Sequence, residues 1–509
     1  MSESRSVNTK RNIVSGVLFK GITIILPFLI RTAILYILGG EYVGLSSLFT
    51  SILQVLNLAE LGFSNAIVYN MYKPIADKDT NKICALLALY KKVYEIIGAF
   101  ILIVGVALMP FLPHLIKGTW PNEINIYLLY VLYLINTSIS YFIFAYKSAL
   151  LNALQRMDIT NIVISVIYII KYIIQLGILI VFKNFYLYVL IGIIATVANN
   201  IVTAYIAEKK YPEYVPHGRV EKDEVADIKK QVTALMICKI SDTSRNSFDS
   251  IVLSMLFGLT LVAIYNNYYY VFSSVHGIVL VITQAMQASV GNSIASETRE
   301  KNYTDLRKFQ FIFSWVVSWC FITMLCLYQP FMRMWAGDTL VLSELDMVLF
   351  CIYFYCINMN NMRNLYFNGN GLWWAANTSF ILESAFNLIL NFGLGYYWGT
   401  TGILVATILT IIVFNFIART NILFREYFHI SPKAFYFDHA KYLTVTSAVG
   451  CCSYYISHCI PIEGIIGIMI RGIICICLPN ILFFIIYRNM KMYKEAKKMA
   501  LSIINARIK

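Results

Sequence analysis

Apolar stretches of about 20 residues follow one another along the whole chain, and short polar segments separate them. A helix of this length crosses the ~30 Å hydrocarbon core of a bilayer. The pattern therefore predicts an all-α polytopic membrane protein with about 14 transmembrane helices. We place the fourteen spans at residues 12–39, 43–70, 83–110, 122–146, 158–181, 184–207, 229–257, 261–290, 308–331, 345–367, 371–397, 401–424, 436–459 and 464–487.

The composition excludes two broad classes of soluble protein. Of the 509 residues, 59% are apolar and 13% are charged, whereas soluble domains carry about 25% charged residues. This number of charged residues is too small to cover the surface of a soluble protein of this length. A soluble enzyme and a nucleic-acid binder are therefore excluded, despite the formal net charge of +14. An excess of positive charge is typical of loops beside a membrane.

Lysine and arginine gather in one set of predicted loops and tails. This set of loops includes, among other basic residues, Lys147, Arg363 and Arg419. The loops on the opposite side hold only Lys117, Lys183 and Arg333. Because cytoplasmic loops carry the excess of basic residues, we predict that both termini lie in the cytoplasm.

The chain contains a predicted internal repeat. A shift of 219 residues places Gly39 on Gly258 and Lys20 on Lys239. Six spans followed by six in the same orientation form a parallel repeat, as in transporters whose two lobes surround a central site. The pattern favours transport rather than catalysis. We predict an N-terminal lobe at 1–207, a cytoplasmic linker at 208–230, a C-terminal lobe at 231–424, and two further spans with a basic tail at 425–509.

The first predicted span carries two cations. A charge inside a membrane costs at least ~2.5–3.5 kcal/mol, so it needs a partner or a hydrated cavity. Lys20 and Arg31 are eleven residues apart, which places them on one face of a helix. The two side chains either face a cavity or extend from the two ends of the span to the membrane surface.

The seventh predicted span carries four charges. Their spacing of three, three and four residues places all of them on one helical face. In one interpretation the four side chains form an internal ladder of salt bridges. In the other, the lysine and the arginine face a cavity, and the two aspartates tune their charge or release them. These residues are Lys239, Asp242, Arg245 and Asp249.

Two glutamates complete the set of candidates for coupling or gating. Glu60 lies in the second span, and Glu383 shares a helical stripe with Asn387 and Asn391 in the eleventh. The full set of coupling or gating candidates is Glu60, Asp242, Asp249 and Glu383. No metal site is predicted, because the 11 cysteines include no C-x-x-C pair and the six histidines are scattered.

The candidate substrate-binding residues are all cationic: Lys20, Arg31, Lys239 and Arg245. This sign favours an anionic cargo, and phosphate is a common ligand of arginine. Export of an anion from an inside-negative cell gains ~2.3 kcal/mol per charge per 100 mV. A driving ion such as H⁺ or Na⁺ is therefore allowed but not required, and no bound cofactor is predicted.

Three stretches of the sequence resemble a known family. The stretch NLAELGFSNAIVYNMYKPIADKD at 57–79 is similar to the second span and first loop of the bacterial polysaccharide flippases of the Wzx type. The stretches FDSIVLSMLFGLTLVAIYNNYYYVF at 248–272 and ASVGNSIASE at 288–297 are similar to their seventh and eighth spans. These flippases belong to the multidrug/oligosaccharidyl-lipid/polysaccharide exporter superfamily, so the resemblance implies a MATE-like fold.

The resemblance also implies a function. Such a flippase moves polyprenyl-pyrophosphate-linked oligosaccharide repeat units to the outer leaflet of the bacterial plasma (inner) membrane by alternating access, for O-antigen, capsule or exopolysaccharide synthesis. The implied partners are the lipid-linked glycan, membrane lipid, a glycan polymerase and other assembly proteins. The cationic lumen of the family maps, by position, onto the four cations named above. A drug/cation antiporter of the same superfamily, a lipid II-type flippase and a membrane glycan polymerase stay open as alternatives.

Overall fold

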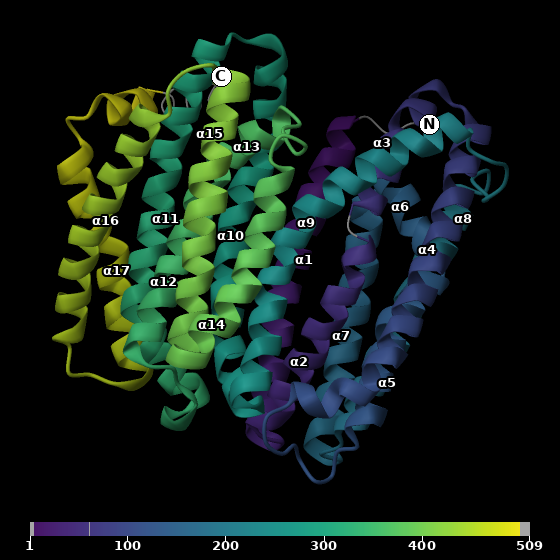
Figure 1. Ribbon diagram of the computed structural model, residues 1–509, viewed down its shortest axis with the longest axis horizontal. Helices are drawn as coiled ribbons and strands as arrows, with labels where there is room; N and C mark the ends of the chain where they lie inside the picture. The colour runs from purple at the N-terminus through teal and green to yellow at the C-terminus, as the bar shows by residue number, and fades with distance from the viewer. Residues whose placement is uncertain (1–4, 61, 499–509) are drawn as a thin grey trace. The chain divides into compact units, whose positions relative to one another are not determined.

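The structure is a computed structural model that describes residues 5–60 and 62–498. Helices make up nearly all of this part of the chain, and no strand occurs in it (Figure 1). Each of the fourteen predicted spans coincides with a helix or with a run of broken helix, so the all-α prediction is confirmed. Length and composition alone qualify 7 helices of the described residues as membrane spans, or up to 8 if a bent pair counts as one span.

Contacts between helices divide the chain into two compact units, Met1–Ala263 and Ile264–Lys509. The first unit holds α1 (Arg5–Ile37), α2 (Gly40–Leu56), η1 (Asn57–Glu60), α3 (Phe63–Asp77), α4 (Thr80–Leu108), η2 (Met109–Leu115), α5 (Ile126–Phe142), α6 (Ala145–Ala153), α7 (Met157–Val181), α8 (Phe185–Lys210) and α9 (Lys222–Phe257). The helix α10 (Leu259–Ser296) continues from the first unit into the second. The second unit adds α11 (Arg299–Ala336), η3 (Asp338–Leu340), α12 (Glu344–Met359), α13 (Asn361–Gly369), α14 (Asn377–Thr410), η4 (Ile411–Ala418), α15 (Arg419–Leu423), η5 (Phe424–Phe428), α16 (Lys433–His458) and α17 (Gly464–Tyr487).

The helix α9 groups with the first unit, although the repeat places it at the start of the C-terminal lobe. It packs along α2, where the buried hydroxyl of Ser247 donates to Gln54 Oε1 at 3.1 Å. Small side chains such as serine let two helices approach closely. The non-helical connection before α9 is also shorter than the predicted linker, because α8 ends at Lys210 and α9 begins at Lys222. The two-lobe repeat itself stays a prediction.

Two glycines make similar corners in the chain. Gly39 joins α1 to α2 with φ 111° and ψ 169°, and Gly258 joins α9 to α10 with φ 88° and ψ −177°. Glycine adopts such positive φ angles readily, whereas residues with a Cβ atom do not. These are the two glycines that the 219-residue shift aligns, so the local backbone agrees with the alignment at this pair.

Several predicted spans are broken rather than continuous. The span predicted at 43–70 stops at Leu56, passes through the short 3₁₀ helix η1 and restarts after Gly62, whose φ is 96°. The pair α5 and α6 is bent by 52°. The run from α14 kinks at Gly399 and continues into the π-helix η4. Such breaks expose backbone groups that neighbouring side chains must satisfy.

Polar side chains define where many helices begin. The side chains of five N-cap residues accept hydrogen bonds from backbone N–H groups of the first turn, as N-caps commonly do. These caps are Asp79, Asn125, Asn184, Thr298 and Ser343. The caps fix the helix starts that the apolar pattern alone placed only within a few residues.

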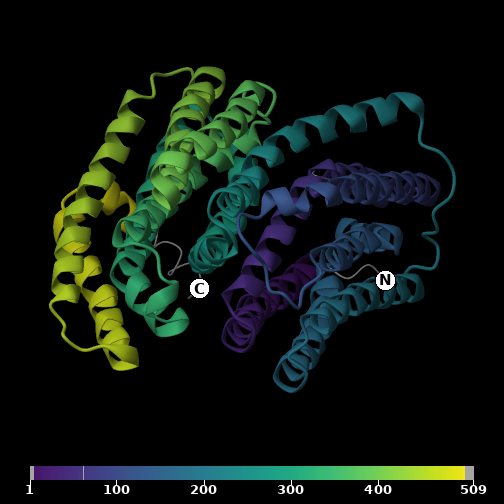
Figure 2. The ribbon, with the colours of Figure 1, turned by 60° about the horizontal axis from the view of Figure 1, so that its bottom comes forward.

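Apolar side chains cover much of the outer surface of each unit. On α7, Ile162 and Ile173 are exposed, and on α17, Ile466 and Ile473 are exposed. Large exposed apolar patches mark surfaces that contact lipid or another protein. The helices α16 and α17 lie side by side and pack on α11 within the second unit (Figures 1 and 2). A lipid-facing surface of this kind is what a polytopic membrane protein requires.

Candidate functional site

The described cations of the predicted substrate site differ in their surroundings. Arg31 is half-buried on α1. Arg245 on α9 is buried, and its Nη2 donates to the carbonyl oxygen of Ser241 at 3.4 Å. Lys239, nearly two turns before it on the same helix, is exposed. Arg245 is therefore held by the protein, whereas Lys239 is accessible.

The remaining predicted residues of α1 and α9 are only partly described. The side chains of Lys20 and Asp242 lie outside the described part of the structure. Asp249 is buried. A shared cationic cavity that includes Lys20, Arg31, Lys239 and Arg245 therefore stays a prediction.

Glu60 is clamped by two tyrosines where α2 breaks. The hydroxyl of Tyr94 on α4 donates to Glu60 Oε1, and the hydroxyl of Tyr141 on α5 donates to Oε2 at 2.6 Å. The Tyr141 hydroxyl also lies 3.3 Å from Asn57 Oδ1. The 3₁₀ turn at Asn57–Glu60 places the carboxylate between these two helices. Glu60 is thus bound by neutral donors, and no pattern in the sequence pointed to either tyrosine.

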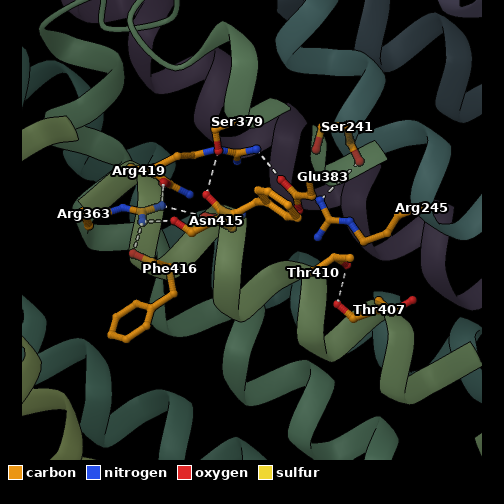
Figure 3. A network of polar contacts seen from close by, with 12 residues as sticks. Ser241, Arg245, Arg363, Ser379, Glu383, Thr407, Thr410, Asn415, Phe416 and Arg419 are labelled. Atoms are coloured by element: carbon orange, nitrogen blue, oxygen red, sulfur yellow. Dashed lines mark hydrogen bonds and ion pairs between the residues drawn. The ribbon is translucent and has the colours of Figure 1, made fainter. Parts of the chain in front are cut away.

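Glu383 lies in a buried polar network of the second unit (Figure 3). It accepts a hydrogen bond from Arg419 Nη2, and the two side chains form an ion pair of which both members are nearly inaccessible. The guanidinium of Arg419 also lies 3.6 Å from the centre of the Phe380 ring, which is a close cation–π contact. Arg419 is therefore a partner of Glu383 that the predicted set of site residues did not include.

The predicted polar stripe of the eleventh span is buried, as its spacing suggests. Glu383, Asn387 and Asn391 are all at most 1% exposed. Asn387 donates to Thr407 Oγ1 at 3.1 Å, and Asn391 donates to Asn387 Oδ1 at 3.4 Å. The stripe joins the two helical segments on either side of the Gly399 kink.

Arg363 is a second functional candidate that the sequence did not identify. It is fully buried, and its Nη2 donates to Asn415 Oδ1 at 2.6 Å. Its Nη1 donates to the carbonyl oxygens of Asn415 and Phe416 and, at 3.1 Å, to Thr420 Oγ1 (Figure 3). The π-helix η4 departs from the regular α-helical hydrogen-bond pattern at these carbonyl groups, and the carbonyl oxygen of Phe416 also accepts the backbone N–H of Arg419. Arg363 thus holds an irregular helix in place.

Three basic residues that were assigned to cytoplasmic loops are instead in the protein interior. Lys147 is 2% exposed and lies 3.3 Å from Glu208 Oε1, while Arg363 and Arg419 belong to the buried network. The loop assignment was wrong because the three residues lie in the helices α6, α13 and α15, with their side chains buried. Buried charges are retained when neighbouring groups pair with them.

An apolar cavity lies beside this network in the second unit. Its volume is about 650 Å³, and α11, α12, η4 and α16 supply its walls. Phe416, whose carbonyl oxygen binds Arg363, is among the lining residues, as are Tyr355 and Leu443. In the second unit, the buried polar network of Arg363, Arg419 and Glu383 therefore lies next to an apolar cavity.

The exposed apolar helices, the broken spans and the buried charges define a polytopic membrane protein. Residues 9–287 match the model of the family described as "Polysaccharide biosynthesis protein". Because this match covers more than half of the 509 residues, the chain belongs to that family. The predicted family resemblance is confirmed. No curated protein matches the sequence.

Several solved structures share the fold at low sequence identity. The structure described as "Lipid II flippase MurJ, inward closed conformation" has a TM-score of 0.68 at 14% identity, over 94% of this chain and 99% of its own. A mutant of the MATE transporter VcmN from Vibrio cholerae has a TM-score of 0.56 at 16% identity, over 83% of this chain and 97% of its own. A MATE transporter in complex with MaL6 has a TM-score of 0.53 at 15% identity, over 82% and 96%. At these identities, the similarity establishes the fold and not the cargo.

Proposed function

We propose that this protein is a flippase that moves polyprenyl-pyrophosphate-linked oligosaccharide repeat units from the inner to the outer leaflet of the plasma membrane by alternating access. The cargo would serve O-antigen, capsular or exopolysaccharide synthesis. The single observation that carries the proposal is membership of the polysaccharide biosynthesis family, across residues 9–287. The fold shared with the lipid II flippase MurJ supports it, because that protein is named for a lipid-linked cargo.

The chemistry of the described residues suits the two parts of such a cargo. Arg31 and Arg245 supply positive charge for the pyrophosphate, since guanidinium groups bind phosphate oxygens with paired hydrogen bonds. The apolar cavity of about 650 Å³ in the second unit suits a polyprenyl chain. An apolar pocket of this size is typical of ligand sites.

The surroundings of the interior carboxylates favour an anionic cargo over a drug cation. Glu383 is paired with Arg419, and Glu60 accepts hydrogen bonds from two tyrosines. Both carboxylates are therefore already engaged by protein donors. A cation exporter would need carboxylates that are open to the cargo.

The proposal includes a location and an energy source. Both termini lie in the cytoplasm of a bacterial cell, and a glycan polymerase and other assembly proteins receive the product. The membrane potential contributes ~2.3 kcal/mol per exported negative charge per 100 mV. Coupling to H⁺ or Na⁺ through Glu60, Asp242, Asp249 or Glu383 would add to this force.

The test uses a deletion strain and measures the leaflet in which lipid-linked repeat units accumulate. Deletion should trap repeat units on the inner leaflet, and the wild-type gene should restore surface glycan. Arg31→Ala or Arg245→Ala should restore little, whereas the matched control Arg425→Ala, which changes an exposed residue, should restore fully. Normal surface glycan in the deletion strain, with increased sensitivity to cationic drugs, would overturn the proposal.

A further inference from the structure

A second cavity, of about 550 Å³, lies in the second unit at the end opposite the α13–α14 connection. It lies where α11 ends, α12 begins, and α16 turns into α17. Its lining differs from that of the apolar cavity, because it includes a dense group of ionisable side chains. These are Arg333, Asp338, Glu344, His458, Glu463 and Arg471.

Arg471 is fixed in position at the inner wall of this pocket. Its Nε donates to the carbonyl oxygen of Ser457 at 3.2 Å, and its Nη2 donates to that of Ile460 at 3.0 Å. The Ser457 carbonyl belongs to the last turn of α16, where a helix presents partial negative charge, and Ile460 follows in the turn to α17. These two hydrogen bonds use Nε and Nη2. They fix the orientation of the guanidinium group but do not involve Nη1. A pre-positioned donor of this kind loses little entropy when it binds a ligand.

The other walls supply acceptors and a flat aromatic surface. At the rim, Arg333 Nη2 lies 3.3 Å from Glu344 Oε1, and both side chains are about half exposed, at 52% and 50%. The ring of Tyr454 stacks on that of His458, with centroids 5.2 Å apart and planes inclined by 25°. Asp338 and Glu463 are not among the ion pairs of the described residues. The pocket therefore offers donors, acceptors and a stacking surface together.

The balance of charge disfavours two simple kinds of ligand. Three carboxylates repel a phosphate or pyrophosphate group, and two guanidinium groups repel a metal ion. A hydroxyl group both donates and accepts a hydrogen bond, so a ligand with many hydroxyls can use both kinds of lining group at once. The volume of about 550 Å³ falls within the usual range of ligand pockets, roughly 300–1,000 Å³.

We propose that this pocket binds the saccharide part of the cargo, through hydroxyl groups, on the outer side of the membrane. The choice of ligand and side rests on the proposed function, which places both termini in the cytoplasm. The loops at 337–343 and 459–463 then face outward, away from the connection at 429–432. The pocket would hold the glycan after translocation, apart from the cations that bind its pyrophosphate.

The experiment measures binding of a soluble glycan to the full-length protein in detergent. The probe is the repeat-unit oligosaccharide of the host, released from its lipid carrier and freed of phosphate. Titration calorimetry should detect binding by the wild type and an affinity about tenfold weaker for the double variant Asp338→Asn/Glu463→Gln. Both substitutions change exposed side chains, so thermal unfolding should be unaltered. The control Glu300→Gln, at an exposed position at the start of α11, should bind as the wild type does.

Three results would overturn this site. The first is no binding at millimolar oligosaccharide, and the second is equal affinity of the double variant and the wild type. The third is displacement of the oligosaccharide by inorganic pyrophosphate or by phosphoethanolamine, which would indicate an anion or lipid-headgroup site. Failure of this site and failure of the flippase proposal are distinguishable, because they appear in separate assays. Normal surface glycan in the deletion strain would contradict the flippase proposal without changing the calorimetric result.

Discussion

Glu60 and Glu383 are both interior carboxylates of predicted spans, but the two units hold them differently. In the first unit, Glu60 accepts hydrogen bonds from tyrosine hydroxyls beside a helix break and is half-buried. In the second unit, Glu383 is buried in an ion pair with Arg419. Removing one tyrosine hydroxyl leaves Glu60 bonded to the other, whereas removing Arg419 leaves Glu383 buried without its ion-pair partner. The second unit is therefore expected to depend more on its carboxylate for stability than the first, and Glu60 stays a predicted coupling residue.

The largest expected effect comes from breaking the ion pair of the second unit. Arg419→Met leaves Glu383 as a buried charge without its ion-pair partner, which typically costs ~3–5 kcal/mol. We expect a marked fall in thermal stability in detergent, measured by the unfolding midpoint. The double variant Arg419→Met/Glu383→Leu should recover much of it, because replacing both partners with apolar groups is often neutral.

The control for this prediction is Arg425→Met, which removes an exposed arginine. It should leave the unfolding midpoint unchanged. If Arg419→Met is as stable as this control, the ion pair contributes nothing to the fold, and the contrast between the two carboxylates disappears.

A smaller effect is expected from Arg363, which binds backbone rather than a carboxylate. Arg363→Met leaves the backbone and side-chain oxygens of Asn415 without this donor, and an unsatisfied buried group costs ~1–3 kcal/mol. Hydrogen exchange should increase over residues 411–418, the π-helix, more than over α16. Unchanged exchange there would show that η4 keeps its shape without Arg363.

The sequence predicted the helices better than it predicted the charged interior. The apolar stretches identified every helical span, and the i, i+4, i+8 spacing identified the buried face of Glu383, Asn387 and Asn391. No proline interrupts 43–70, so the sequence showed no strong signal for the break at η1. Arg363 and Arg419 were misassigned because their partners lie on other helices, and a single sequence shows no contact between distant residues.

Weakening the hydrogen bonds of Glu60 is expected to reduce stability less than the changes at Arg419 and Arg363. Tyr141→Phe removes one hydroxyl donor and should cost ~1 kcal/mol of stability, the usual net value of a hydrogen bond. Glu60→Gln keeps an acceptor for the tyrosines, so the protein should stay folded while flipping loses its response to a proton gradient. Flipping in proteoliposomes with an imposed pH gradient tests this expectation, and a preserved response would assign coupling elsewhere.

The smallest effect on stability is expected at Lys239, because the side chain is exposed on α9. Lys239→Ala should leave the unfolding midpoint unchanged but slow the flipping of a pyrophosphate-linked cargo. Lys239→Cys, in a background without other cysteines, should react with a water-soluble thiol reagent. Protection of this cysteine from the reagent would remove Lys239 from the hydrated path.

The interruption of the second predicted span also has a mechanical consequence. A continuous α-helix is a stiff rod that turns as one piece, whereas α2 and α3 meet through one short turn and a left-handed glycine. The break separates the direction of α3 from that of α2, and α3 packs on α4, α6 and α9. Glu60 stands at this junction, so its bonds to Tyr94 and Tyr141 tie the turn between the two segments to α4 and α5.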